Sequence, residues 1–129
     1  MPGSARTFDV TFAPPAGQQI ARITVAIDYP DGRVSIPGSG DNPSVVASIT
    51  KLPFGHSSTP DDLDWELLEA IVGASAITPG RLFEITFQDC ACAAPPTAGD
   101  FTCLVVDATD PLGNPVAPDT LTCSVSAAP

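Results

Sequence analysis

Hydrophobic and polar residues alternate along several short stretches of the chain. The clearest alternation covers residues 22–29, where the apolar or aromatic positions are Ile23, Val25, Ile27 and Tyr29. Successive side chains of a β-strand point to opposite faces, so this pattern predicts a strand with one buried face and an inward-pointing Tyr29. Similar patterns predict further strands at residues 8–12, 34–36, 45–50, 83–87, 101–107 and 121–125.

Prolines and glycines separate these stretches. The chain contains 15 prolines and 10 glycines, which fall between the apolar runs rather than in one block. Turn signals at intervals of about 8 to 12 residues are typical of an all-β sandwich or barrel. The spacing therefore predicts an all-β protein with eight or nine strands.

Residues 60–72 fit two different predictions. Residues 59–62 combine a threonine, a proline and two acidic residues, as the first turn of a helix often does. Yet a second series alternates with residues 66, 68, 70 and 72, which favours a strand with both faces partly covered; its members are Trp65, Leu67, Glu69 and Ile71. Because tertiary context often overrides local propensity, we favour a strand and keep one short helix near residues 60–72 as the alternative.

Length and charge narrow the class of protein. A chain of 129 residues is long enough for one ordinary domain and too short for two. We expect a single domain over residues 1–129, with residues 1–6 flexible or foreign to the natural protein and residues 127–129 forming a tail. The net charge of −10 repels phosphate backbones and anionic lipids, so we expect no nucleic-acid partner. No apolar run approaches the about 20 residues of a membrane span, so we expect no membrane insertion.

Three segments resemble cohesin-like domains. Residues 20–36 place an alternating strand before a Tyr-Pro-Asp-Gly turn and a short strand, and residues 77–87 place a glycine turn before an alternating strand. Residues 110–116 carry the pattern Asp-x-x-Gly-Asn-x-Val before the final strand. The resemblance implies an antiparallel jelly-roll sandwich of nine strands, related to cohesins and to some carbohydrate-binding modules. It also implies a noncatalytic module that binds another protein.

Four cysteines lie in the C-terminal part of the chain: Cys90, Cys92, Cys103 and Cys123. Four cysteines allow three pairings, and a bond between Cys90 and Cys92 would close a very small ring. We therefore favour the two pairings that join Cys90 and Cys92 separately to Cys103 and Cys123. Such disulfides predict an extracellular or cell-surface protein whose signal peptide is absent from this chain. The Cys-x-Cys spacing is a poor match to a structural zinc site, which is the rival interpretation.

Two groups of loop residues carry oxygen ligands that calcium could use. The first group is Asp61, Asp62 and Asp64, and the second is Asp107, Asp110 and Asn114. Neither group has the Asp-x-Asp-x-Asp-Gly pattern of a calcium loop, and such residues usually bond their own backbone. We therefore expect no cofactor or metal, with residues 61, 62 and 64 as weak calcium candidates.

No residue pattern indicates an enzyme. His56 is the only histidine, and no nucleophile or metal-binding motif accompanies it, so we expect a solvated loop residue. Glu66 and Glu69 could in principle act as paired carboxylates, but no other catalytic chemistry converges with them. Trp65 is the single candidate binding residue, as an exposed platform for a sugar ring, although we favour a buried core anchor.

Three functions are compatible with these observations. The first is a noncatalytic extracellular interaction module that binds a protein through the outward residues of the strands around Val34, Trp65 and Leu104. The second is a carbohydrate-binding module that uses an exposed Trp65 or a calcium loop to bind a polysaccharide. The third is a structural, self-associating surface domain in which the proline pairs at 14–15 and 95–96 form stiff connections.

Overall fold

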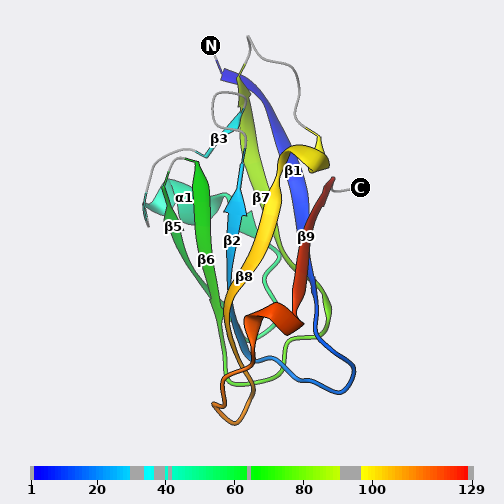
Figure 1. Ribbon diagram of the computed structural model, residues 1–129. Helices are drawn as coiled ribbons and strands as arrows, with labels where there is room; N and C mark the ends of the chain where they lie inside the picture. The colour runs from blue at the N-terminus through cyan, green and yellow to red at the C-terminus, as the bar shows by residue number, and fades with distance from the viewer. Residues whose placement is uncertain are drawn as a thin grey trace.

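Two antiparallel β-sheets pack face to face as a sandwich (Figure 1). The computed structural model describes residues 2–29, 34–36, 40, 42–63, 65–90 and 97–127, and these residues contain nine strands. Sheet A has the order β3 (Val34–Ser35), β7 (Gly80–Cys90), β1 (Pro2–Ala13) and β9 (Thr122–Ala127), and β4 (Ile49–Thr50) also pairs with β7. Sheet B has the order β5 (Ser57–Asp62), β6 (Glu66–Val72), β2 (Arg22–Asp28) and β8 (Thr102–Thr109). The prediction of an all-β sandwich with eight or nine strands is confirmed.

The core lies between the sheets because the alternating apolar positions point inward. From sheet A the buried side chains include Phe8, Val10, Phe12, Phe83, Ile85 and Phe87, and from sheet B they include Ile23, Val25, Ile27, Leu67 and Ile71. Phe8, Tyr29, Phe87 and Phe101 form an aromatic cluster with ring centroids 4.6 to 6.1 Å apart. The inward position predicted for Tyr29 is confirmed, since only 5% of this residue is exposed.

Residues 57–72 form the strand pair β5 and β6, so the alternative of a short helix near residues 60–72 was wrong. The two strands pair in register from Ser57 opposite Val72 to Asp62 opposite Leu67. The burial of β6 alternates along its whole length, with Leu67, Glu69 and Ile71 inside. Cross-strand pairing and burial of these three side chains override the helix-like residues at the start.

The single α-helix among the described residues, α1, covers Pro43–Ala47, where the alternation had predicted a strand over residues 45–50. The Asn42 side chain caps this helix by accepting a hydrogen bond from the Ser44 backbone N–H at 3.0 Å. Pro43 occupies the first helical turn, where its missing N–H costs nothing. The helix-starting residues Asn42-Pro43-Ser44 therefore outweigh the strand preference of the β-branched Val45 and Val46. Only Ile49–Thr50 forms a strand, β4.

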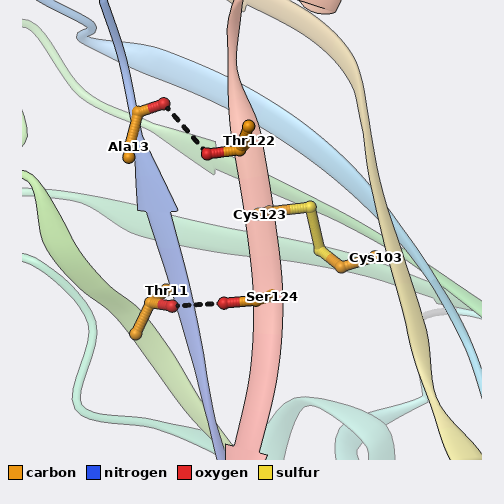
Figure 2. Close-up of a disulfide and its surroundings, with 6 residues drawn as sticks. All are labelled: Thr11, Ala13, Cys103, Thr122, Cys123 and Ser124. Carbon is orange, nitrogen blue, oxygen red and sulfur yellow. Dashed lines mark hydrogen bonds between the residues drawn. A yellow bond between two sulfur atoms is a disulfide. The ribbon is translucent and has the colours of Figure 1, made fainter. Parts of the chain in front are cut away.

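A disulfide between Cys103 of β8 and Cys123 of β9 joins the edges of the two sheets (Figure 2). The Cα atoms of the two cysteines lie 5.5 Å apart. No backbone ladder joins these strands in the described part of the chain, so the disulfide cross-links two sheet edges that are otherwise connected only through the loop of residues 110–121. At the opposite edge, α1 packs against β5, and Gly40 forms an antiparallel bridge with Asp62.

The two disulfide pairings predicted from the sequence were therefore wrong. Cys123 lies opposite Phe12 of β1, and Phe12 lies opposite Gly80 at the start of β7. Cys90 lies at the far end of β7, on the order of 30 Å from that level at about 3.3 Å per residue. The prediction failed because it assumed that all four cysteines form bonds with distant partners. Cys92 and the side chain of Cys90 lie outside the described residues.

Strand register places four loops at the same end of the sandwich, the lower end in Figure 1. These loops are residues 14–21, 51–56, 73–79 and 110–121. The N-terminal residues 2–6, which the sequence suggested would be flexible, belong to β1 and pair with the last residues of β7. Of the two proline pairs, residues 14–15 lie in the first loop and residues 95–96 lie outside the described residues.

Candidate functional site

The outer face of sheet B carries exposed apolar side chains. Leu104 and Val106, both on β8, are 68% and 47% exposed. Trp65 and Leu63, in the turn between β5 and β6, are 53% and 41% exposed. Large apolar residues on a strand usually pack inward, so the exposed Leu104 and Val106 make this face a candidate contact surface.

Strand register brings the apolar side chains of this face into one row. Ala26 of β2 lies opposite Leu68 of β6 on one side and opposite Leu104 of β8 on the other. A register shift between β2 and β8 adds Val106 as an extra residue between the pairs formed by Val105 and Asp107. Ordinary alternation from Leu104 directs Val106 outward, and the bulge leaves the following residue, Asp107, exposed as well. We call Leu68, Ala26, Leu104 and Val106 the apolar stripe.

Carboxylates border the apolar stripe on three sides. Asp61 lies opposite Leu68 across the strand pair, and Asp107 follows Val106 on β8. Asp28 and Glu66 lie directly opposite each other, two residues along β2 and β6 from the stripe. The protonated Glu66 carboxyl can donate a hydrogen bond to Asp28, and this interaction, with smaller contributions from burial and charge repulsion, raises the pKa of Glu66 above its usual value.

A second carboxyl of β6 points into the protein. Glu69 is fully buried, and the Ser58 hydroxyl donates a hydrogen bond to its Oε1, whereas Oε2 has no hydrogen-bond partner among the described residues. Burial raises the pKa of Glu69 to about 7, and the hydrogen bonds from Ser58 and from the Thr59 backbone oppose this shift. Because the carboxyl is sealed from solvent, Glu69 cannot act on an external substrate.

Trp65 is not the buried core anchor that the sequence favoured. The chain around it is fixed because the Tyr29 backbone N–H donates a hydrogen bond to the Trp65 carbonyl oxygen at 3.1 Å. Position 65 falls in the turn just before β6 begins, and the space between the sheets next to it is filled by Tyr29 and Phe87. The ring is therefore left half exposed at the end of sheet B.

The first group of calcium candidates does not converge. Asp61 and Asp62 are neighbours on β5, so their side chains point to opposite faces, and Asp61 is exposed while Asp62 is buried. The Tyr29 hydroxyl donates a hydrogen bond of 2.6 Å to Asp62 Oδ1 inside the core, so this oxygen does not face the exposed Asp61 side chain. Asp64 lies outside the described residues.

The second group of candidates forms a loop instead of a metal site. Asp110 Oδ1 accepts hydrogen bonds from the backbone N–H groups of Leu112 and Asn114, both at 2.9 Å. Asp110 thus stabilises its own turn, as Asp residues in loops commonly do. In the part of the chain that the structure describes, no three His, Cys, Asp or Glu residues are arranged to bind a metal.

His56 is half-buried and held by its surroundings, in contrast to the expected solvated residue. Its Nε2 lies 3.1 Å from the Ala21 carbonyl oxygen and 3.0 Å from that of Ser75, and its Nδ1 lies 3.0 Å from that of Phe54. A Cβ atom at Gly73 would lie 2.5 Å from the imidazole ring, so the close packing requires a glycine there. The residue therefore connects three loops at the lower end of the sandwich.

The three strands expected to form a contact surface do not share one face. Val34 belongs to β3 in sheet A and is completely buried, whereas Leu104 belongs to sheet B and Trp65 to the turn beside it. Sequence analysis also missed the roles of Ala26 and Leu68, because only the strand pairing shows that they lie beside Leu104. The alternation in β6 did place Glu69 on the same face as Leu67 and Ile71, and that signal indicated its burial.

Comparison with protein-family models, with curated proteins and with solved structures finds no match for this chain. No helix in the described ranges is long and apolar enough to cross a membrane. The fold and the surface chemistry therefore carry the functional argument.

Proposed function

We propose that this domain is a noncatalytic module that binds a protein partner through the outer face of sheet B. The observation that carries the proposal is the apolar stripe, in which Leu104 remains 68% exposed on the outer face of sheet B. Burial of a leucine or valine side chain contributes about 1.5 to 3 kcal/mol, so covering Leu104 and Val106 would favour association. The surrounding carboxylates give this surface the polar border that protein interfaces usually have.

Two features support a noncatalytic role. The hollow on this face, lined in part by Arg22, Thr24, Asp107 and Thr109, has a volume of about 190 Å³. This hollow is smaller than the usual about 300 to 1,000 Å³ of small-molecule pockets, whereas hollows of about 350 to 450 Å³ lie away from this face, beside β1 and at the lower end of the sandwich. The most strongly shifted carboxyl, Glu69, is buried under the sheet and faces away from this hollow.

An extracellular location follows from the disulfide and from the sequence resemblance. Disulfides such as Cys103–Cys123 persist mainly in oxidising compartments. The resemblance of residues 20–36 and 77–87 to cohesin-like domains agrees with a secreted binding module. We therefore place the domain outside the cell or on its surface.

A polysaccharide is the second candidate ligand, because Trp65 is 53% exposed and could stack on a sugar ring. Trp65 lies beyond the end of the apolar stripe, so the two candidate ligands depend on different residues. Binding to a polysaccharide panel that Trp65→Ala abolishes and Leu104→Asp preserves would favour this candidate over a protein partner.

The test of the proposed function compares substitutions on the two outer faces. Wild-type domain, Leu104→Asp and Thr50→Asp are immobilised and exposed to secreted proteins of the source organism. Thr50 is exposed on sheet A, so Thr50→Asp adds the same charge on the opposite face. We expect wild type and Thr50→Asp to retain the same proteins and Leu104→Asp to lose them. Equal retention by all three, or retention of no protein above a charge-matched control domain, would contradict the proposal.

A further inference from the structure

Asp28 and Glu66 form a pair of acidic side chains at the end of the apolar stripe. They lie directly opposite each other on neighbouring antiparallel strands, and both belong to the outward series of their strands. Like charges in this position destabilise a sheet unless something neutralises them. The facing Asp28 carboxyl raises the pKa of Glu66, in line with their directly opposed positions.

No basic side chain in the described ranges neutralises this pair. Two ion pairs between described residues lie on sheet A, where Lys51 pairs with Glu84 at 3.1 Å and Arg81 with Asp9 at 3.8 Å. Arg22 is on the same strand as Asp28 but six residues away, which corresponds to about 20 Å along a strand. The paired acids therefore lack a cation within the described structure of the face that we propose as the interface.

Apolar surface adjoins the acidic pair on two sides. The apolar stripe begins two residues away along β2 and β6, where Ala26 and Leu68 lie opposite each other. Trp65 directly precedes Glu66 in the chain and is 53% exposed at the same end of sheet B, where an aromatic ring would offer a second attraction for a cation. A ligand with a basic group next to apolar groups would match all three features.

From this arrangement we infer that the partner of sheet B presents a lysine or arginine to Asp28 and Glu66, with adjacent apolar side chains that cover Leu68 and Leu104. The inference rests on the proposed function and specifies its partner: a protein surface or segment with basic and apolar residues side by side. Charge complementarity selects this occupant, because a second copy of a chain with net charge −10 would bring further carboxylates to the same place.

The test uses random short peptides displayed on phage as the probe and the intact wild-type domain as the target. Affinities of the enriched peptides, as free synthetic peptides, are then measured for wild type, Asp28→Asn/Glu66→Gln and Leu104→Asp. The double variant Glu84→Gln/Asp119→Asn is the matched control, because it removes two negative charges away from the outer face of sheet B. Thermal unfolding of each variant establishes that it is folded.

We expect the enriched peptides to contain lysine or arginine next to apolar residues. Their affinity should fall by roughly ten-fold or more in Asp28→Asn/Glu66→Gln and remain unchanged in the control, since loss of a charge pair at an interface weakens binding to this extent. Enrichment of peptides without basic residues, or equal affinity for the two double variants, would overturn the inference.

The same experiment separates this inference from the proposed function. Peptides that bind Asp28→Asn/Glu66→Gln as tightly as wild type but do not bind Leu104→Asp would support the proposed interface. They would refute the inference that its partner is basic. Peptides that tolerate both changes, or failure to enrich any peptide, would count against the interface itself.

Discussion

The outer faces of the two sheets differ in how their side chains are satisfied. On sheet A, Thr7 bonds Thr86 across β1 and β7 at 3.1 Å, and Thr11 bonds Ser124 across β1 and β9 at 2.9 Å (Figure 2). Ion pairs join Lys51 to Glu84 and Arg81 to Asp9 on the same sheet. On sheet B, the corresponding positions carry the apolar stripe and the opposed acids Asp28 and Glu66. The outer face of sheet A is therefore crossed by hydrogen bonds and ion pairs, with Asp9 Oδ1 lacking a hydrogen-bond partner among the described residues, whereas the outer face of sheet B has apolar and acidic groups that a partner could cover.

The inner faces differ as well. In sheet A the buried inward positions are apolar, whereas sheet B turns two carboxyl side chains, Asp62 and Glu69, towards the core. Tyr29 satisfies one oxygen of Asp62, but Glu69 has a hydrogen bond on one oxygen only. Sheet B therefore carries groups that disfavour folding on both faces: a buried carboxyl on the inner face and the opposed acids Asp28 and Glu66 on the outer face.

The largest expected effect concerns this buried carboxyl and depends on pH. The folded pKa of Glu69, about 7, lies above its ordinary value of 4.5, so the unfolded chain ionises first as the pH rises. Glu69 therefore lowers the free energy of unfolding progressively between pH 4.5 and 7, by about 3 kcal/mol in total, and this loss persists above pH 7. Glu69→Gln stays neutral and should avoid the loss.

Urea unfolding of wild type and Glu69→Gln over this pH range checks the prediction. The variant should exceed wild type by about 3 kcal/mol at pH 8, and the difference should shrink towards zero near pH 4.5. Taking the difference between the two proteins cancels the titration of the exposed acids. Parallel stability curves would show that Glu69 does not titrate in this range.

The second prediction concerns the link between the two sheets. The Cys103–Cys123 disulfide closes a loop with a sequence separation of 20 residues, which stabilises the folded state by about 3 kcal/mol through the unfolded chain. Cys103→Ala/Cys123→Ala should lose this amount in urea unfolding, and reductant should then have little further effect on the variant. Peptide mapping that finds either cysteine bonded to Cys90 or Cys92 would contradict the structure.

Much of this fold could be predicted from the sequence because burial repeats every second residue in a strand. That rule located β2 and the centre of β7, and it placed Glu69 in line with Leu67 and Ile71. It failed at residues 43–47, where a helix cap and a proline act locally whatever the alternation. The disulfide and the apolar stripe could not be predicted in the same way, since both depend on which strands are neighbours and in what register.

A smaller loss of stability is expected from a change on the outer face of sheet A. Thr86→Ala removes the hydrogen bond to Thr7, which is partly buried and spans β1 and β7. Such a bond contributes about 0.5 to 1.5 kcal/mol, so the free energy of unfolding should fall by about 1 kcal/mol. Thr7→Ala should cost a similar amount, and combining the two changes should cost less than their sum, because one bond is lost in each case. Full additivity in urea unfolding would show that the two hydroxyls act independently.

The smallest effect on stability is expected on sheet B, where the functional effect should be the largest. Leu104→Thr replaces a side chain that is 68% exposed by one that favours strands, so the free energy of unfolding should change by about 0.5 kcal/mol or less. The same change removes the largest contact of the apolar stripe and should weaken any enriched peptide that binds this face. Urea unfolding and peptide affinity measured on one preparation would show the two effects together. A loss of more than about 1 kcal/mol in stability with no loss of affinity would mean that Leu104 supports the fold and not an interface, because exposed surface positions rarely carry stability of that size.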